Sequence, residues 1–175
     1  EPLINSLNQL LTHRGPDSEG IFLKDEIALA MRRLSIIDLD GGNQPMISQD
    51  GKYTIIFNGE IYNHDYLRKD LIKKGYPIKT HSDTEVLLYS YIDQGKNCLQ
   101  GLNGMFAFAL WDNTERTLFL ARDRMGEKPL YYGCSGESFL FGSELKALRV
   151  HPSFQSEINR DVISLLLRHS CIPAP

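Results

Sequence analysis

The sequence has no long hydrophobic run, little cysteine and no large excess of charge of either sign, and each absence excludes a class of protein. The longest apolar run, Met105 to Trp111, is far shorter than the ~20 residues that span a bilayer. The 19 Lys and Arg and 22 Asp and Glu give a net charge of -3, which indicates neither a nucleic-acid surface nor an acidic tail. No basic and apolar leader opens the chain, so we expect neither a membrane protein nor a secreted one.

Cysteine and histidine are too scattered to indicate a metal or redox site. Cys98, Cys134 and Cys171 form no C-x-x-C pair, and His64 and His81 do not have the spacing of metal ligands. No glycine-rich phosphate loop of the P-loop form is present. We therefore expect reduced cysteines in a cytoplasmic protein, without a metal site.

What the chain does contain is the composition of a single globular domain, with 42% hydrophobic residues in 175. Periodicity predicts helices over 2–12, 63–75, 82–95, 144–150 and 161–168. It predicts strands over 21–23, 27–31, 33–38, 53–57, 76–79, 105–111, 117–121, 129–132 and 138–141. The Asp50-Gly51 pair predicts a hairpin turn before the strand at 53–57. Because the strands are mostly joined by short connections, the pattern favours a layered α+β domain with antiparallel sheets over a doubly wound parallel one.

The segment IIFNGEIYN, Ile55 to Asn63, is the most informative for function. Asn-Gly between two strands usually forms a hairpin turn, but here a predicted helix follows instead of a second strand. In the alternative, the side-chain amide of Asn58 and the N–H of Gly59 point into one space. Two such donors form an oxyanion hole, which stabilises the charge that develops on a carbonyl oxygen during acyl transfer. The residues alone leave both interpretations open.

Three charged residues each allow a structural role or a binding role. Arg32 and Arg33 are either surface side chains of a strand or a guanidinium site for a small carboxylate. Asp83 lies in Ser82 to Glu85, which has the S-x-x-E form of a helix capping box. Its carboxylate either complements the helix dipole or pairs with an ammonium group of a substrate. The charged turns 13–17 and 122–124 are predicted to be hydrogen-bonded loops.

Nine segments occur together in an order that is similar to a known family. They are HRGPD at 13–17, RRLSIID at 32–38, GNQPM at 42–46, FNGEIYN at 57–63, HSDTEVLL at 81–88, LNGMFAFALWD at 102–112, LFLARDR at 118–124, KPLYY at 128–132 and SELKAL at 143–148. Over nearly all 175 residues the chain resembles the class II glutamine amidotransferase (glutaminase) domain of glutamine-hydrolysing asparagine synthetases and their relatives.

The resemblance implies an N-terminal-nucleophile (Ntn) hydrolase fold, a four-layer αββα sandwich with two antiparallel sheets between helical layers. It implies that the nucleophile is a cysteine at the first position of the mature chain, with its own α-amino group as base. The thiolate attacks the side-chain amide of L-glutamine, ammonia leaves, and the thioester is hydrolysed to glutamate. This domain needs no cofactor, whereas ATP and Mg²⁺ serve a C-terminal synthetase domain that amidates aspartate or a related carboxylate.

The resemblance also implies roles for individual residues of this sequence. Asn58 and the N–H of Gly59 match the oxyanion hole. Arg33 matches the residue that binds the α-carboxylate of glutamine. Asp83 matches the residue that binds its α-ammonium group, with Glu60 assisting.

The backbone of Ile36 and Ile37 is expected to border the glutamine pocket. The expected partners are L-glutamine and the synthetase domain in cis, and the resemblance is compatible with a homodimer. Neither nucleic acid nor a membrane is expected to bind.

One family feature is missing from the sequence, since a Cys-Gly-Ile strand precedes the position of His13 in the family and does not occur here. None of the three cysteines has a free α-amino group, so none is expected to replace it. We therefore expect a glutaminase domain that lacks its first strand and its synthetase domain, and that is inactive alone.

The alternative is a vestigial scaffold or glutamine-binding module of a synthetase, but the joint presence of four matching site residues favours the first interpretation. A pure interaction module would instead expose an apolar strip and have no pocket. The acceptor of the ammonia is not encoded in these residues.

Overall fold

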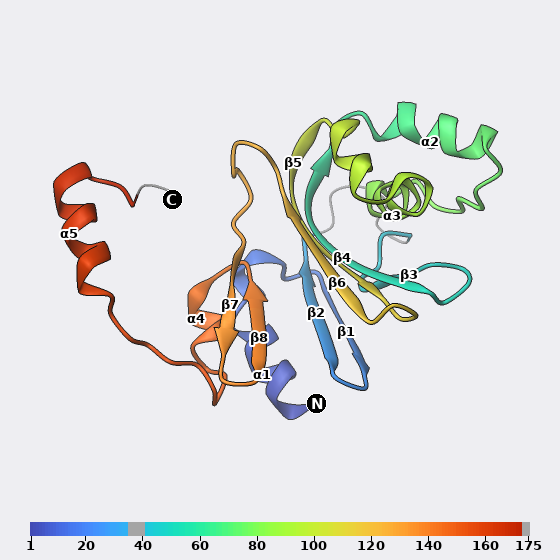
Figure 1. The fold of residues 1–175 in the computed structure, drawn as a ribbon. Helices are drawn as coiled ribbons and strands as arrows, with labels where there is room; N and C mark the ends of the chain where they lie inside the picture. The colour runs from blue at the N-terminus through green and yellow to red at the C-terminus, as the bar shows by residue number, and fades with distance from the viewer. Residues whose placement is uncertain (35–40, 173–175) are drawn as a thin grey trace.

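The centre of the fold is a four-stranded antiparallel sheet, seen in a computed structural model that describes residues 1–34 and 41–172 (Figure 1). In the order β3-β4-β5-β6, its strands are β3 (Met46–Ile47), β4 (Tyr53–Ile61), β5 (Gly104–Asp112) and β6 (Thr117–Arg122). A tight turn joins β3 to β4, and Gly51 in that turn has a φ of 71°, a conformation that favours glycine. This hairpin turn was predicted from the Asp50-Gly51 pair.

Two further antiparallel hairpins form a second layer. One pairs β1 (Ser18–Lys24) with β2 (Ile27–Arg33), and the other pairs β7 (Tyr131–Ser135) with β8 (Ser138–Gly142). Figure 1 shows both hairpins on one side of the large sheet, and β2 contacts β4. Among the described residues the second layer thus consists of two separate hairpins rather than one continuous sheet.

Helices cover the outer faces of both layers. Helix α3 (Asp83–Gln94) packs on β4, and α2 (His64–Lys73) packs on α3. On the other side α1 (Pro2–Gln9) packs on β2, and α4 (Leu145–Leu148) packs on β8. The layers therefore follow the predicted αββα order. The 3₁₀ helices are η1 (Thr12–Arg14) and η2 (Gly95–Gln100).

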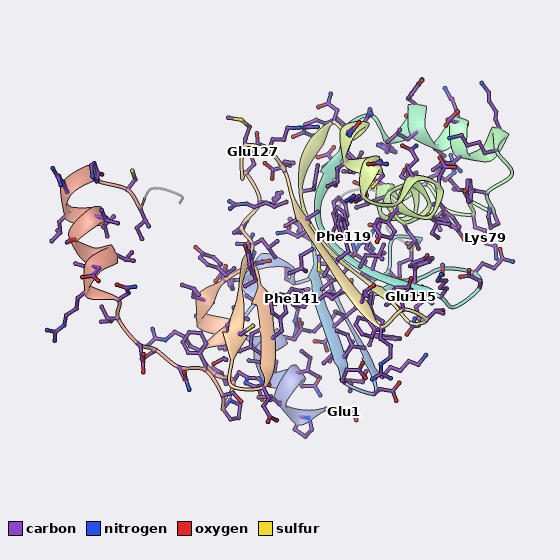
Figure 2. The ribbon with its side chains drawn as sticks, in the orientation of Figure 1. Glu1, Lys79, Glu115, Phe119, Glu127 and Phe141 are labelled. Atoms are coloured by element: carbon purple, nitrogen blue, oxygen red, sulfur yellow. The ribbon has the colours of Figure 1, made fainter. Side chains whose placement is uncertain are left out.

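Helix α5 (Arg160–His169) extends away from the rest of the molecule, and Figure 2 shows its side chains projecting on all sides. The side chain of Asn159 caps its first turn by accepting hydrogen bonds from the N–H groups of Asp161 and Val162. None of its residues is buried, although its apolar residues lie mostly on one face.

The hydrophobic core lies between the large sheet and α3. Ile55 and Ile61 of β4 and Leu87 of α3 have no exposed surface, and seven consecutive residues of β5, 106–112, are buried. Phe119 of β6, labelled in Figure 2, closes one end of this core with its ring 5.1 Å from that of Tyr91. Because α3 covers one face of the sheet and β2 contacts the other, β5 is buried along almost its whole length.

Two predicted local structures, the strand over 76–79 and the capping box at 82–85, are wrong, and the strand predicted over 33–38 is tested only at its start. Residues 76–79 form no strand, because their N–H groups bond locally or to the carboxylate of Glu85. Glu85 thereby turns toward Lys79 and Thr80, so the capping box is not formed, and the N-cap Ser82 accepts from Thr84 instead. Arg33 ends β2 rather than starting a new strand, and most of the predicted strand 33–38 lies outside the described residues.

Candidate active site

A cavity of about 350 Å³ lies where β2, η1, the middle of β4 and the start of α3 meet. Arg33, Asn58, Gly59, Glu60 and Asp83 all line it. The structure therefore brings together five predicted site residues that come from three separate parts of the chain. The other two, Ile36 and Ile37, lie outside the described residues.

Strand β4 carries three of these residues, and its alternation decides where their side chains point. Successive side chains of a strand face opposite sides of the sheet. Phe57 and Ile61 are buried in the core beneath α3, at 3% and 0% exposure. Asn58 and Glu60 alternate with them, so their side chains face the opposite side, on which β2 lies. Of the two interpretations that the residues left open, the Asn-Gly hairpin turn is not present, because β4 continues straight through both residues.

The backbone N–H groups of β4 also alternate between its two edges. The N–H of Phe57 donates to Oε1 of Gln44 at 2.6 Å, and the N–H of Ile61 donates to Oδ2 of Asp83 at 3.1 Å. Gly59 lies midway between these two residues in the same alternation. Its N–H therefore points to the same edge, into the space between Gln44 and Asp83.

The side-chain Nδ2 of Asn58 is a buried donor without a partner in the described part of the chain. It has less than 1 Å² of exposed surface and no hydrogen bond to any described residue. Leaving a buried donor unpaired costs about 1–3 kcal/mol, and in a native protein such a group calls for an explanation. A ligand oxygen in the cavity that Asn58 lines supplies one.

Only glycine fits at position 59, because β5 approaches the backbone there. A Cβ atom on this residue would lie 2.2 Å from the carbonyl oxygen of Met105 and 2.7 Å from Cα of Phe106. Both contacts are to backbone atoms, which cannot move away as a flexible side chain can. Any side chain at position 59 would therefore push β4 and β5 apart and displace Asn58.

The two neighbouring arginines of β2 have different surroundings. Arg32 is opposite Glu19 in the β1–β2 ladder and forms an ion pair with it at 2.6 Å. Its Nε also donates to the carbonyl oxygen of Asn8 in α1. Arg33 is 8% exposed and lines the cavity. Both arginines line the cavity, and Arg33 is the one that the family resemblance implies for binding the carboxylate of a ligand.

Asp83 is the first residue of α3 and is 6% exposed. Burial raises the pKa of its carboxyl above the ordinary value, although the N–H of Ile61 stabilises the carboxylate and opposes this. A cation that entered the cavity beside Asp83 would offset the desolvation of the carboxylate. The burial therefore suits the binding of an ammonium group.

None of the cysteines among the described residues lines this cavity. Cys98 is buried in η2, and burial raises the pKa of its thiol to about 11, so it is protonated at neutral pH. Cys134 is exposed in β7, and Cys171 is exposed after α5. All three thiols are free.

Residues that we did not predict also line the cavity, among them His13, Arg14, Gln44 and Lys128. His13 and Arg14 both contact Oε1 of Glu144, at 2.8 and 3.0 Å. These four residues and Glu144 all lie within motifs that carry the family resemblance. Membership of these motifs was the signal that could have identified them. Their separate positions in the sequence gave no indication that they meet in space.

Glu144 is expected to hold His13 and Arg14 at the mouth of the cavity. Its hydrogen bond from His13 is the main cause that lowers the pKa of its carboxyl to about 2.

Because the ion pairs of Glu144 with His13 and Arg14 are partly exposed, we expect Glu144→Ala to lower the free energy of unfolding by about 1 kcal/mol or less. Equilibrium unfolding in urea should show this loss at neutral pH. The difference from wild type should disappear as the pH falls from about 4.5 toward about 2, where Glu144 becomes protonated in the folded protein. A difference that is the same at pH 7 and pH 2 would contradict this role.

Within the described parts of the chain, no group of three or more His, Cys, Asp or Glu residues is arranged to hold a metal ion. No helix of the described residues is long and apolar enough to cross a membrane.

Comparison with known proteins identifies what the chain is similar to. A family model described as a glutamine amidotransferase domain matches residues 1–175. Asparagine synthetase [glutamine-hydrolyzing] 3 of Bacillus subtilis is 44% identical over 163 residues, which cover 92% of this chain and 26% of that protein. Asparagine synthetase B [glutamine-hydrolyzing] of Escherichia coli is 43% identical over 143 residues, covering 81% of this chain and 26% of that protein. The chain therefore spans about a quarter of the length of these relatives.

Among solved structures, glutamine phosphoribosylpyrophosphate amidotransferase of B. subtilis superimposes with a TM-score of 0.70 and 26% identity. The match covers 85% of this chain and 40% of that one. An allosteric regulatory enzyme of purine biosynthesis superimposes with a TM-score of 0.59 and 30% identity, over 70% of this chain and 29% of that one. These matches confirm the predicted α+β Ntn-hydrolase fold.

Proposed function

The chain belongs to the glutamine amidotransferase family, and on this premise we propose that its cavity binds L-glutamine and releases ammonia from the side-chain amide. The observation that carries the proposal is the buried Nδ2 of Asn58, which has no partner among the described residues, in a cavity that Arg33 and Asp83 also line. These residues supply one donor for an oxyanion, one cation for a carboxylate and one anion for an ammonium group. Glutamine carries all three complementary groups in one small molecule.

The two charged ends of glutamine determine how it lies in the proposed complex. The guanidinium of Arg33 binds the α-carboxylate, and the carboxylate of Asp83 binds the α-ammonium group, assisted by Glu60. The side-chain amide then extends toward Asn58 and Gly59. Holding both ends positions the amide carbon for attack and removes much of the entropic cost of the reaction.

In the proposed reaction the thiolate of an N-terminal cysteine, which the 175 residues do not contain, forms a bond to the amide carbon. The α-amino group of that cysteine accepts the thiol proton and passes it to the leaving nitrogen, which departs as ammonia. Water then hydrolyses the thioester to glutamate and regenerates the thiol. In both tetrahedral intermediates, Asn58 Nδ2 and the N–H of Gly59 donate to the oxyanion.

Beyond this domain, we propose that the ammonia is used to amidate a carboxylate, with aspartate as the first candidate acceptor. Two of the relatives carry asparagine synthetase and glutamine hydrolysis in their names and are about four times longer than this chain. ATP and Mg²⁺ belong to the synthetase part in this proposal, and no step at the described cavity requires them.

The proposal is tested by measuring glutamate and ammonia after adding glutamine to the complete gene product. We expect the two products in equal amounts, and the same rate when Cys98, Cys134 and Cys171 are all replaced by serine. The 175-residue chain alone is expected to bind glutamine in calorimetry but to release no ammonia. Ammonia release that depends on any of these three cysteines would contradict the mechanism. Glutamine binding without hydrolysis by the complete product would instead support the vestigial binding module.

A further inference from the structure

The side chain of Gln44 connects the two walls of the cavity. Its Oε1 accepts the hydrogen bond from the N–H of Phe57, and its Nε2 donates to Oγ1 of Thr84 at 3.2 Å. Phe57 directly precedes Asn58 in β4, and Thr84 directly follows Asp83 in α3. One amide thus touches the neighbour of the proposed oxyanion donor and the neighbour of the proposed ammonium-binding carboxylate.

The position of Gln44 follows from the short length of β3. Strand β3 pairs with β4 only through Met46 with Ile55 and Ile47 with Thr54. Continuing this register by two residues places Gln44 opposite Phe57. At that point the backbone ladder has ended, and the side-chain amide of Gln44 takes over as the acceptor for the N–H of Phe57. The edge of β4 beyond this point is left open to the cavity.

The backbone of Gln44 is also held from the side of β1. A Cβ atom on Gly20 would lie 1.9 Å from the carbonyl oxygen of Gln44 and 2.9 Å from Cδ of Pro45. Strand β1 therefore packs directly on this residue. Gln44 has little freedom to shift, so its amide can hold β4 and α3 at a set spacing.

Asp83 forms the second link between β4 and α3, through the N–H of Ile61. The segment Asn58-Gly59-Glu60 lies between the two links, and all three of its residues line the cavity. An amide side chain suits the first link because it offers an acceptor to the N–H of Phe57 and a donor to the hydroxyl of Thr84 at once. Leucine, of similar size, offers neither.

We propose that Gln44 is a positioning residue for glutamine hydrolysis, which sets the distance between the oxyanion donors on β4 and Asp83 on α3. The inference rests on the proposed function. Gln44 acts through Asn58 and Asp83 rather than on the reacting atoms. Because the transition state requires both groups at once, loosening the link lowers kcat more than it raises KM.

The test compares Gln44→Leu, Thr84→Val and the double variant in the complete gene product, with glutamine as substrate. We expect Gln44→Leu to lower kcat/KM by about 10- to 100-fold, mainly through kcat. Thr84→Val breaks the same link from its other end and should lower kcat in the same direction. The double variant should be no worse than Gln44→Leu alone, because both substitutions remove one interaction.

Asn113→Ala is the matched control, since the side chain of Asn113 also bonds two groups of the β3–β4 hairpin, the carbonyl oxygens of Gly51 and Lys52. Asn113 does not line the cavity, so this variant should lower the melting temperature without changing kcat. A normal kcat in Gln44→Leu would overturn the inference. A low kcat in Gln44→Leu with a normal kcat in Thr84→Val would also overturn it, because Gln44 would then act by direct contact. If the wild-type product released no ammonia, the proposed function itself would fail.

Discussion

Replacing Asn58 with alanine is expected to lower kcat for glutamine hydrolysis by about 10²- to 10³-fold, the effect of removing one donor from an oxyanion hole. KM should change little, because the charge on the carbonyl oxygen develops only in the transition state. The same substitution should raise the melting temperature, since it removes a buried donor that has no partner among the described residues. Steady-state kinetics of the complete gene product and thermal unfolding measure the two effects.

Asn113→Ala is the same chemical change, and we expect it to have the opposite effects on stability and on kcat. The Nδ2 of Asn113 bonds two backbone carbonyls at the far end of β4, so its loss should lower stability and leave kcat unchanged. A fall in the melting temperature of Asn58→Ala, or an unchanged kcat, would indicate that Asn58 supports the fold instead of the reaction.

Asp83→Asn is expected to weaken glutamine binding by at least about 100-fold, because breaking a buried ion pair costs about 3 kcal/mol or more. The variant should nevertheless be at least as stable as wild type at neutral pH. Its amide oxygen can still accept the N–H of Ile61, and the desolvated charge is gone. Calorimetric titration with glutamine and equilibrium unfolding test the two expectations.

The raised pKa of Asp83 determines how the stability difference between wild type and Asp83→Asn changes with pH. The pKa of Asp83 is raised in the folded protein, so its contribution to stability is greatest below the ordinary value of 3.8 and is lost as the pH rises through the raised pKa. The stability gained in Asp83→Asn should therefore be present at pH 7 and absent below about pH 3.8. Glutamine binding by wild type should weaken as the pH falls through the raised pKa, because protonated Asp83 cannot pair with an ammonium group.

Asp65→Asn is the matched control, since Asp65 lies in the first turn of α2 as Asp83 does in α3, but is exposed. A helix-dipole role at Asp83 would make the two substitutions similar, each with a small loss of stability and no effect on glutamine. Equal glutamine affinity in wild type and Asp83→Asn would rule out the proposed ammonium site.

The elements that could be predicted are those whose pattern is local. Apolar patterns and helical spacing identified β4, β5 and β6 of the large sheet and helix α3, and the Asp50-Gly51 pair identified the turn before β4, whereas the two-residue strand β3 was not predicted. Residues 76–79 were predicted wrongly because a strand needs a partner, and apolar residues alone do not supply one. The carboxylate of Glu85 accepts hydrogen bonds from the N–H groups of Lys79 and Thr80, and these bonds determine the backbone conformation there.

The candidate site, like the fold, could be predicted only in part from the sequence. The sequence by itself determined the family, through nine ordered motifs, and with it the chemical types that line the cavity: an amide, a guanidinium and carboxylates. Only the tertiary structure decided which of these groups are available to a ligand. It pairs Arg32 with Glu19, buries Asp83, and gives Nδ2 of Asn58 no partner within residues 1–34 and 41–172. It also brings Gln44 between Phe57 and Thr84, and Glu144 beside His13, across 131 positions of the chain. A motif records which groups are present, whereas burial and hydrogen bonding depend on neighbours that are distant in sequence.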